Sequence, residues 1–211
     1  MKNTIWLDVD GVLLDYTRAF LEFTGLGKKG VTYDNLFDYD LTKLFPSADA
    51  CYAAMLEFTK SERFMYLQAI AKRRDVEMLK NIGFTLKVIT QLPTDSPFKV
   101  NRVRNLTTFF GPVFDEVIFT DRGQSKLDYI IERPEYRQGL NWLIEDNPIL
   151  LVEVDAFIGQ QIKIHGGKTN LMAIAVEHPY NTASLATLEH LVVVPNFEVA
   201  ADIIANGVYN G

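Results

Sequence analysis

The sequence predicts an α/β protein with a three-layer, doubly wound parallel sheet and a small helical insert after the first strand. Short runs of apolar and β-branched residues recur along the chain, and the stretches between them carry apolar residues at helical spacing. Strands that alternate with helices favour a parallel sheet covered by helices on both faces. Residues 15–80 contain no comparable strand. This stretch is too long for a simple crossover and indicates an inserted helical segment.

The individual elements follow from local signals. Ser47 is expected to cap a helix of the insert, Gly83 to end the helix before the second strand, and Ser96 with Pro97 to begin the next helix. A final helix is expected over 198–205. The predicted strands cover residues 3–9, 84–90, 116–120, 141–144, 171–176 and 191–194. We therefore expect a core domain of residues 1–14 and 81–211, with residues 15–80 as its insert.

Composition excludes several classes of protein. The chain has 211 residues, of which 48% are hydrophobic, so a substantial core is expected. The net charge of -6 and the absence of a long basic run argue against duplex nucleic acid as a partner. The single cysteine, Cys51, excludes a disulfide framework. With no signal segment and no apolar run of membrane-spanning length, we expect a cytoplasmic protein without a membrane partner; a homodimer is left open.

Polar residues follow four of the predicted strands, where the chain leaves the sheet. These residues are Asp8 and Asp10, Thr90, Lys126, and Glu145 with Asp146. The carboxyl ends of parallel strands meet at one edge, so these side chains are expected to gather there. A nucleophile, an acid or base, a hydroxyl, a cation and metal-binding carboxylates are what phosphoryl transfer needs. Each residue also has an ordinary interpretation, such as a polar turn at Asp8 to Gly11 or a surface lysine at 126, with Lys163 and Lys168 as competing cations.

The string Asp8-Val9-Asp10-Gly11-Val12 resembles the first motif of the haloacid dehalogenase (HAD)-like phosphatases, and the later strand-end residues match that superfamily's remaining motifs in order. The resemblance implies a Rossmann-like core with a cap domain. It also implies Asp8 as the nucleophile and Asp10 as general acid and then general base. The implied ligands of Mg²⁺ are Asp8, the backbone carbonyl of Asp10, and Asp146. Glu145 is implied either as a further ligand or as an acid that supports the ligands. The implied phosphate-binding residues are Thr90, Gln91 and Lys126.

Three segments resemble the 5′(3′)-deoxyribonucleotidase branch of that superfamily: Asp8 to Tyr16, Leu143 to Asp146, and His178-Pro179-Tyr180-Asn181. This similarity implies a magnesium-dependent 5′-nucleotidase acting on deoxynucleoside monophosphates, with a small phosphorylated substrate as partner. Tyr16 is the expected substrate contact, because it follows the acids closely and its ring can stack on a base. The alternatives are a phosphatase for a sugar phosphate or a nucleic-acid 3′-phosphate, and a catalytically weak phosphate-binding module. A dehalogenase lacks the second acid.

Other conspicuous groups are expected to be structural or solvated. The histidines lack metal-ligand spacing, and basic residues on two predicted helices suggest solvated faces. The helix after Pro97 is expected to bury an apolar stripe of Val100, Val103 and Phe110. The residues assigned to surface or structural roles are His165, His178, His190, Lys72, Arg73, Arg74, Lys99, Arg102 and Arg104. Most of a further aromatic group is expected to pack in the core of the insert, with a stacking surface for a base or ring as the alternative: Phe20, Phe37, Tyr39 and Phe45.

Overall fold

A single sheet of six parallel strands organises the protein. The computed structural model describes residues 3–92, 96–121 and 123–209. The strand order is β3-β2-β1-β4-β5-β6, and every neighbouring pair is parallel. The strands are β1 (Thr4–Leu7), β2 (Thr85–Gln91), β3 (Glu116–Thr120), β4 (Asn141–Glu145), β5 (Leu171–Val176) and β6 (Val192–Val194). The predicted fold class is confirmed, and all six predicted strands are present with small shifts at their ends.

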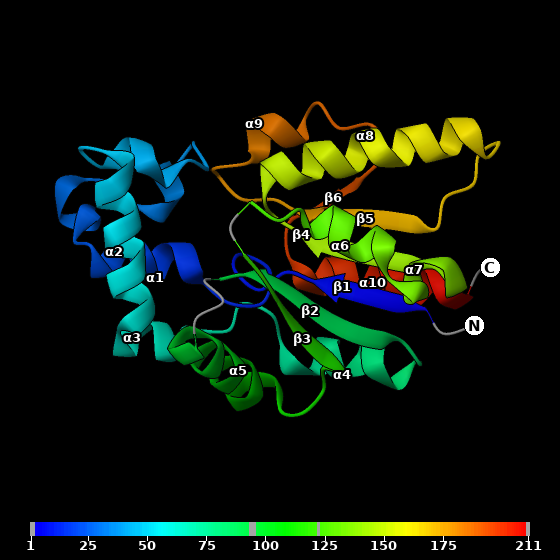
Figure 1. Ribbon diagram of the computed structural model, residues 1–211, viewed down its shortest axis with the longest axis horizontal. Helices are drawn as coiled ribbons and strands as arrows, with labels where there is room; N and C mark the ends of the chain where they lie inside the picture. The colour runs from blue at the N-terminus through cyan, green and yellow to red at the C-terminus, as the bar shows by residue number, and fades with distance from the viewer. Residues whose placement is uncertain (1–2, 93–95, 122, 210–211) are drawn as a thin grey trace.

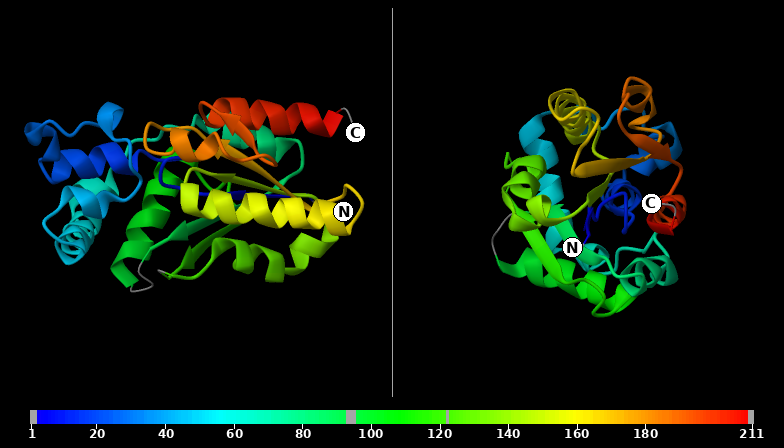
Figure 2. Two further views of the ribbon diagram at one scale, coloured as in Figure 1. Left: turned by 90° about the horizontal axis from the view of Figure 1, so that it is seen from above. Right: turned by 90° about the vertical axis from the view of Figure 1, so that its right-hand side faces the viewer.

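Helices cover both faces of this sheet, as its apolar strands require. One face packs against α4 (Arg73–Asn81), α5 (Ser96–Phe110) and α10 (Phe197–Tyr209). The other packs against α6 (Lys126–Glu132) and α8 (Pro148–Ile164), next to the short α7 (Pro134–Gln138). Side chains alternate across each strand, so Ile5 and Leu7 of β1 join the first core and Trp6 joins the second. Figure 2 shows α8 and α10 on opposite sides of the sheet.

The segment after β1 forms a helical insert at the carboxyl ends of the strands (Figure 1). It contains α1 (Tyr16–Phe23), α2 (Ala48–Lys60) and α3 (Glu62–Met65), with short 3-10 turns between α1 and α2. Ser47 caps α2 as predicted, because its side chain accepts a hydrogen bond from the backbone N–H of Ala50. The insert therefore lies above the edge of the sheet where ligands of parallel sheets bind.

Helix α4 packs with the sheet rather than with the insert. Val76 and Leu79 are fully buried in the core cluster that contains β1 and β2. Arg74 at the start of the helix forms an ion pair with Glu198 of α10 at 2.8 Å, and Lys72 contacts the same carboxylate. The predicted division at residue 80 stays a prediction, and the packing of α4 favours an earlier boundary.

Helix α5 buries a different face from the one that the spacing of Val100 and Val103 predicts. Val100 and Val103 are 56% and 40% exposed, whereas Arg102 and Asn105 are fully buried. The expected apolar stripe is therefore wrong except at Phe110, and Arg102 does not lie on a solvated face. The backbone of α5 begins at Ser96 as expected, while the predicted cap by the Ser96 side chain lies outside the described side chains.

No helix within the described residues is long and apolar enough to cross a membrane. Helix α8, the longest within the described residues, has 17 residues and packs its apolar side along the sheet. The short helix α9 (Thr182–Leu185) follows β5 and lies beside α8 (Figure 1).

Candidate active site

The turn after β1 brings two acids to the carboxyl edge of the sheet. Asp8 follows the last strand residue, and its backbone N–H donates to the carbonyl of Ile144 on β4 at 3.0 Å. The chain then turns back, with the N–H of Leu14 donating to the carbonyl of Val9 at 2.8 Å. Gly11 has a φ of +83°, a conformation that residues with a Cβ rarely adopt. The sequence therefore places Asp8 and Asp10 through a glycine turn, as predicted.

Lys126 lies beside Asp8, not on the surface. It is the first residue of α6, and its Nζ donates to Asp8 Oδ1 at 2.6 Å and to Glu145 Oε2 at 2.7 Å. Burial opposes its charge, but the two carboxylates outweigh burial and raise the pKa of Lys126 above its ordinary value. Its competitor Lys163 lies in the last turn of α8, roughly 24 Å along that helix from the acidic pair. The structure thus brings Lys126 to the site.

Glu145 and Asp146 lie at the end of β4 and have different surroundings. Glu145 Oε1 accepts from the backbone N–H groups of Asp146 and Asn147, both at 3.1 Å, and Oε2 accepts from Lys126. Both oxygens of Glu145 therefore already have donors, which favours a supporting role over a direct metal contact. Burial, reinforced by the charge of Asp8, raises the pKa of Glu145 to about 7.

Asp146 is held by the segment that follows β5. The hydroxyl of Tyr180 donates to Asp146 Oδ2 at 2.5 Å, and the Asn181 side chain donates to the Asp146 carbonyl at 2.7 Å. His178 Nε2 donates to the carbonyl of Gly11 at 2.7 Å, and its Nδ1 accepts from Tyr33 of the insert. These bonds confirm a structural role for His178. They also give the Pro-Tyr-Asn segment a function that the sequence did not reveal.

Three buried carboxylates at this edge could bind a metal ion. Asp8, Glu145 and Asp146 each offer an oxygen atom, and these atoms lie within 4.8 Å of one another. Burial and the charge of Asp8 raise the pKa of Asp146 well above its usual range. An all-oxygen set of carboxylates suits a hard divalent cation such as Mg²⁺, whose charge would relieve the repulsion between them. The residues present fit such an ion, with Asp8 and Asp146 as the ligands that the geometry favours.

Asp10 has a partner that the sequence did not predict. The buried guanidinium of Arg102 on α5 donates from Nη2 to Asp10 Oδ2 at 2.7 Å. Asp10 Oδ1 is buried and has no hydrogen-bond partner within the described part of the chain. Burial raises the pKa of Asp10 although Arg102 acts against it. No local signal identifies this pair, because 92 positions separate the two residues.

The predicted phosphate-binding residues differ in how freely they could bind an anion. Thr90, near the end of β2, is 1% exposed, and its hydroxyl has no partner among the described residues. Gln91 is exposed, and its side-chain amide donates to the carbonyl of Asp121 at 3.2 Å. Thr90 therefore has an unpaired hydroxyl and lines the same cavity as Asp8 and Lys126, whereas the amide of Gln91 already has an acceptor in the loop after β3.

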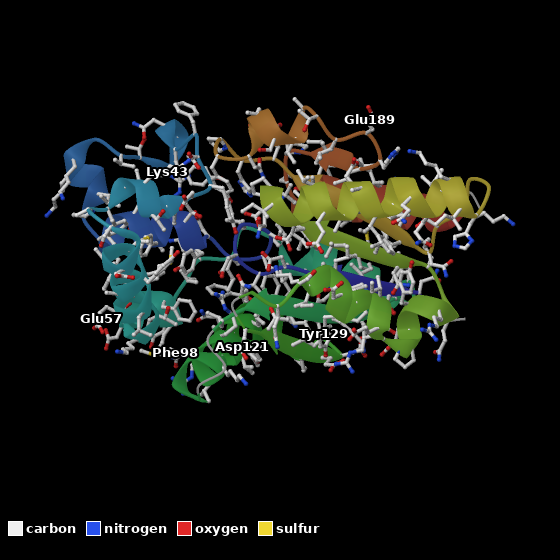
Figure 3. The ribbon with its side chains drawn as sticks, turned by 45° about the horizontal axis from the view of Figure 1, so that its top comes forward. Lys43, Glu57, Phe98, Asp121, Tyr129 and Glu189 are labelled. Atoms are coloured by element: carbon white, nitrogen blue, oxygen red, sulfur yellow. The ribbon has the colours of Figure 1, made fainter. Side chains whose placement is uncertain are left out.

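The predicted site residues line one cavity of about 240 Å³ between the insert and the edge of the sheet. They are Asp8, Asp10, Thr90, Gln91, Lys126, Glu145 and Asp146. Figure 3 shows the side chains of the two parts, with Lys43 and Glu57 on the insert and Tyr129 on the part with the sheet. The insert contributes Tyr16, Thr17, Leu36, Tyr39, Leu41 and Met55 to the lining. The insert thus forms the wall opposite the acids.

The two tyrosines of that wall have different surroundings. The ring of Tyr16 stacks on Phe20 at 5.9 Å and meets the edges of Phe58 and Phe64, so it belongs to the core of the insert as well as to the cavity. Tyr39 is 37% exposed and lines the same cavity. The expectation that Tyr39 lies in the core is wrong, because the chain between α1 and α2 turns its ring toward Tyr180 at 5.9 Å. The same expectation is wrong for Phe37, which is 76% exposed.

Solved structures resemble the whole chain. A haloacid dehalogenase-like hydrolase from Burkholderia xenovorans has a TM-score of 0.63 and 12% identity, covering 99% of both chains. The D,D-heptose 1,7-bisphosphate phosphatase of Burkholderia thailandensis has a TM-score of 0.54 and 14% identity, covering 97% of this chain and 98% of the other. The chain has the HAD-like fold. Neither a family model nor a curated protein sequence matches it.

The HAD-like fold alone does not decide the chemistry. The magnesium-bound hydrolase YfnB of Bacillus subtilis also resembles the chain, with a TM-score of 0.53 and 12% identity over 96% of this chain and 98% of that one. Among the similar structures are also 2-haloacid dehalogenases. Phosphatases and dehalogenases thus share this fold, and the side chains at the strand ends must distinguish between them.

Proposed function

We propose that the protein is a magnesium-dependent phosphomonoesterase that forms an aspartyl-phosphate on Asp8. The observation that carries this proposal is the second acid, Asp10, which lines the same cavity as Asp8 two positions along the chain. A carboxylate nucleophile alone suits dehalogenation or phosphate transfer, but an alkoxide needs a proton to leave and a halide ion does not. The raised pKa of Asp10 suits a group that must donate a proton.

In the first half of the reaction, a carboxylate oxygen of Asp8 attacks phosphorus and the ester P–O bond breaks. Asp10 gives its proton to the departing oxygen, so the alcohol leaves neutral. Lys126 and the free hydroxyl of Thr90 stabilise the negative charge on the phosphoryl oxygens. Bound Mg²⁺, held by Asp8, Asp146 and the backbone carbonyl of Asp10, would supply charge that offsets repulsion between carboxylate and phosphate.

In the second half, water attacks phosphorus and the bond to Asp8 breaks, releasing inorganic phosphate. Asp10, now ionised, takes the proton from that water. Lys126 meanwhile keeps Asp8 as a carboxylate leaving group through its bond to Oδ1. Glu145 holds both Lys126 and the backbone of Asp146 in place, because it accepts hydrogen bonds from the Lys126 ammonium and from the backbone N–H of Asp146.

The substrate that we propose is a deoxynucleoside monophosphate. Apolar and aromatic side chains of the insert face the acids across the cavity, including Leu36, Tyr39 and Met55. Lys126 is the one cation among the described residues of the lining. If the substrate carried a second phosphate group, that group would find no cation in this cavity to bind it. A neutral, flat nucleoside matches these walls better than a bisphosphate does.

Metal removal and a panel of esters test this function. We expect phosphate release from deoxynucleoside monophosphates to stop in excess chelator and to return on addition of Mg²⁺, because the carboxylates repel the substrate without a cation. The measurement is phosphate release over nucleotides, sugar phosphates and a nucleic-acid 3′-phosphate. Full activity in chelator, or restoration by zinc alone, would contradict the magnesium assignment. Faster turnover of a sugar phosphate would contradict the nucleotide assignment.

Tyr16→Ala tests the expected contact with the base. Loss of a stacking ring should reduce kcat/KM for a deoxynucleoside monophosphate by about 10- to 100-fold, from a stacking energy of roughly 1–3 kcal/mol. Hydrolysis of glycerol phosphate should change little. Tyr16 also packs on Phe58, so its removal can disturb the core of the insert. Tyr39→Ala is therefore the companion variant, because the Tyr39 ring lines the cavity without being fully buried. Equal losses on both substrates in Tyr16→Ala would assign Tyr16 to the core of the insert.

A further inference from the structure

The ion pair between Arg102 and Asp10 is the least expected contact of the site. Arg102 is fully buried on α5, with Nε and Nη1 lacking hydrogen-bond partners among the described residues. Burying a guanidinium without satisfying it is costly, so it requires compensation. The compensation on this side chain is one bond of 2.7 Å to Asp10 and the face of the Phe64 ring at 4.7 Å.

A second contact joins α5 to the insert close to Arg102. Phe64 belongs to α3, the last helix of the insert, and its carbonyl accepts from the Asn105 side chain at 2.6 Å. Asn105 lies nearly one turn after Arg102 on α5 and is equally buried. The guanidinium therefore lies at the junction of α3 and α5, where its own contacts are the carboxylate of Asp10 and the ring of Phe64.

The same geometry excludes a direct role for Arg102 in binding phosphate. Asp10 lines the cavity, whereas Arg102 is fully buried and absent from the lining. The guanidinium reaches the site only through the carboxylate of Asp10. Only Oδ2 of that carboxylate is paired, so the carboxylate is held in place without both oxygens being engaged, and it can still accept a proton.

We propose that Arg102 is a positioning residue that holds the carboxylate of Asp10 in the place from which it delivers and later removes a proton. This inference rests on the proposed phosphatase function. A carboxylate on a short side chain must keep hydrogen-bond reach to the departing oxygen and then to water, and a fixed partner behind it reduces its freedom in both steps.

The test compares esters that differ in how much they need an acid. Nucleoside monophosphates have a poor leaving group, whereas 2,4-dinitrophenyl phosphate releases a stable anion without protonation. In Arg102→Gln we expect kcat/KM for the nucleotide to fall about 100-fold or more, the usual size of general acid catalysis. Dinitrophenolate should still appear in a rapid burst of one equivalent per enzyme, followed by slow turnover, because removal of the proton from water also needs Asp10.

Two variants separate positioning from folding. Arg102→Lys keeps a cation near Asp10 and should recover part of the nucleotide activity. Asn105→Ala removes the bond to the Phe64 carbonyl in the same junction but leaves the ion pair, so the ratio of the kcat/KM values for the two esters should stay at the wild-type value. Thermal unfolding of each variant shows whether the junction still folds.

The outcomes distinguish this inference from the proposed function. If the wild-type protein with Mg²⁺ hydrolyses none of the esters, the phosphatase function fails and the inference fails with it. If the wild-type protein is active and Arg102→Gln loses the same fraction of kcat/KM on both esters, or none, Arg102 has no positioning role and the inference alone is overturned. An equal change of the ratio in Asn105→Ala would also overturn it.

Discussion

Asp8→Asn is expected to abolish phosphate release while leaving the fold intact. An amide cannot form the aspartyl-phosphate, and removal of a catalytic nucleophile typically costs about 10⁴-fold or more in kcat. The fold should survive because Lys126 keeps its bond to Glu145 at 2.7 Å, so its charge is not left unpaired. The substitution also removes one of three carboxylates that lie within 4.8 Å of one another, which relieves repulsion in the metal-free protein.

The measurement is phosphate release with deoxynucleoside monophosphates, together with the melting temperature and mass spectrometry of protein quenched during turnover. The wild-type protein should gain the mass of one phosphoryl group and Asp8→Asn should not. Asp202→Asn, an exposed aspartate on α10, makes the same chemical change away from the site and should keep full activity. Near-normal turnover by Asp8→Asn would refute the covalent mechanism.

Gly11→Ala is expected to disrupt the metal site from the backbone side. A Cβ built on Gly11 would overlap Asp146 Oδ2, would lie 2.6 Å from Asp146 Cγ and would lie 2.9 Å from the Tyr180 hydroxyl. The backbone at φ +83° adds strain of roughly 1–2 kcal/mol for any residue with a Cβ. The Asp146 carboxylate would have to leave its position, so we expect affinity for Mg²⁺ to fall by about 10-fold or more, following the usual cost of disturbed metal-ligand support.

Gly30→Ala is the matched control for this substitution. Gly30 has a φ of +87°, but a Cβ there would meet no atom within 4 Å. Both variants therefore share the backbone strain, and only Gly11→Ala pushes on Asp146. Titration of each protein with Mg²⁺, followed by calorimetry or by the shift in melting temperature, should show weakened binding in Gly11→Ala alone. Equal affinities in the two variants would mean that Asp146 does not hold the ion.

The sequence alone predicted the parallel sheet and the residues at its strand ends. This succeeded because strands buried on both faces are continuous apolar runs, a purely local pattern, and because parallel topology brings every strand end to one edge. Asp8, Asp10, Thr90, Lys126 and Asp146 therefore needed no knowledge of packing to be gathered into one site. The insert was recognisable for a similar reason, since it lacks strands over a long stretch after β1.

The tertiary structure alone decided which polar groups are paired and which faces are buried. Apolar spacing predicted that Val100 and Val103 of α5 are buried, yet α5 buries Arg102 because Asp10, 92 positions earlier, offers a carboxylate in the interior. The bond between Tyr180 and Asp146 and the engagement of both Glu145 oxygens likewise join residues through the fold. Local patterns record the hydrophobicity of a segment, whereas the burial of a charge depends on a partner that only the folded chain supplies.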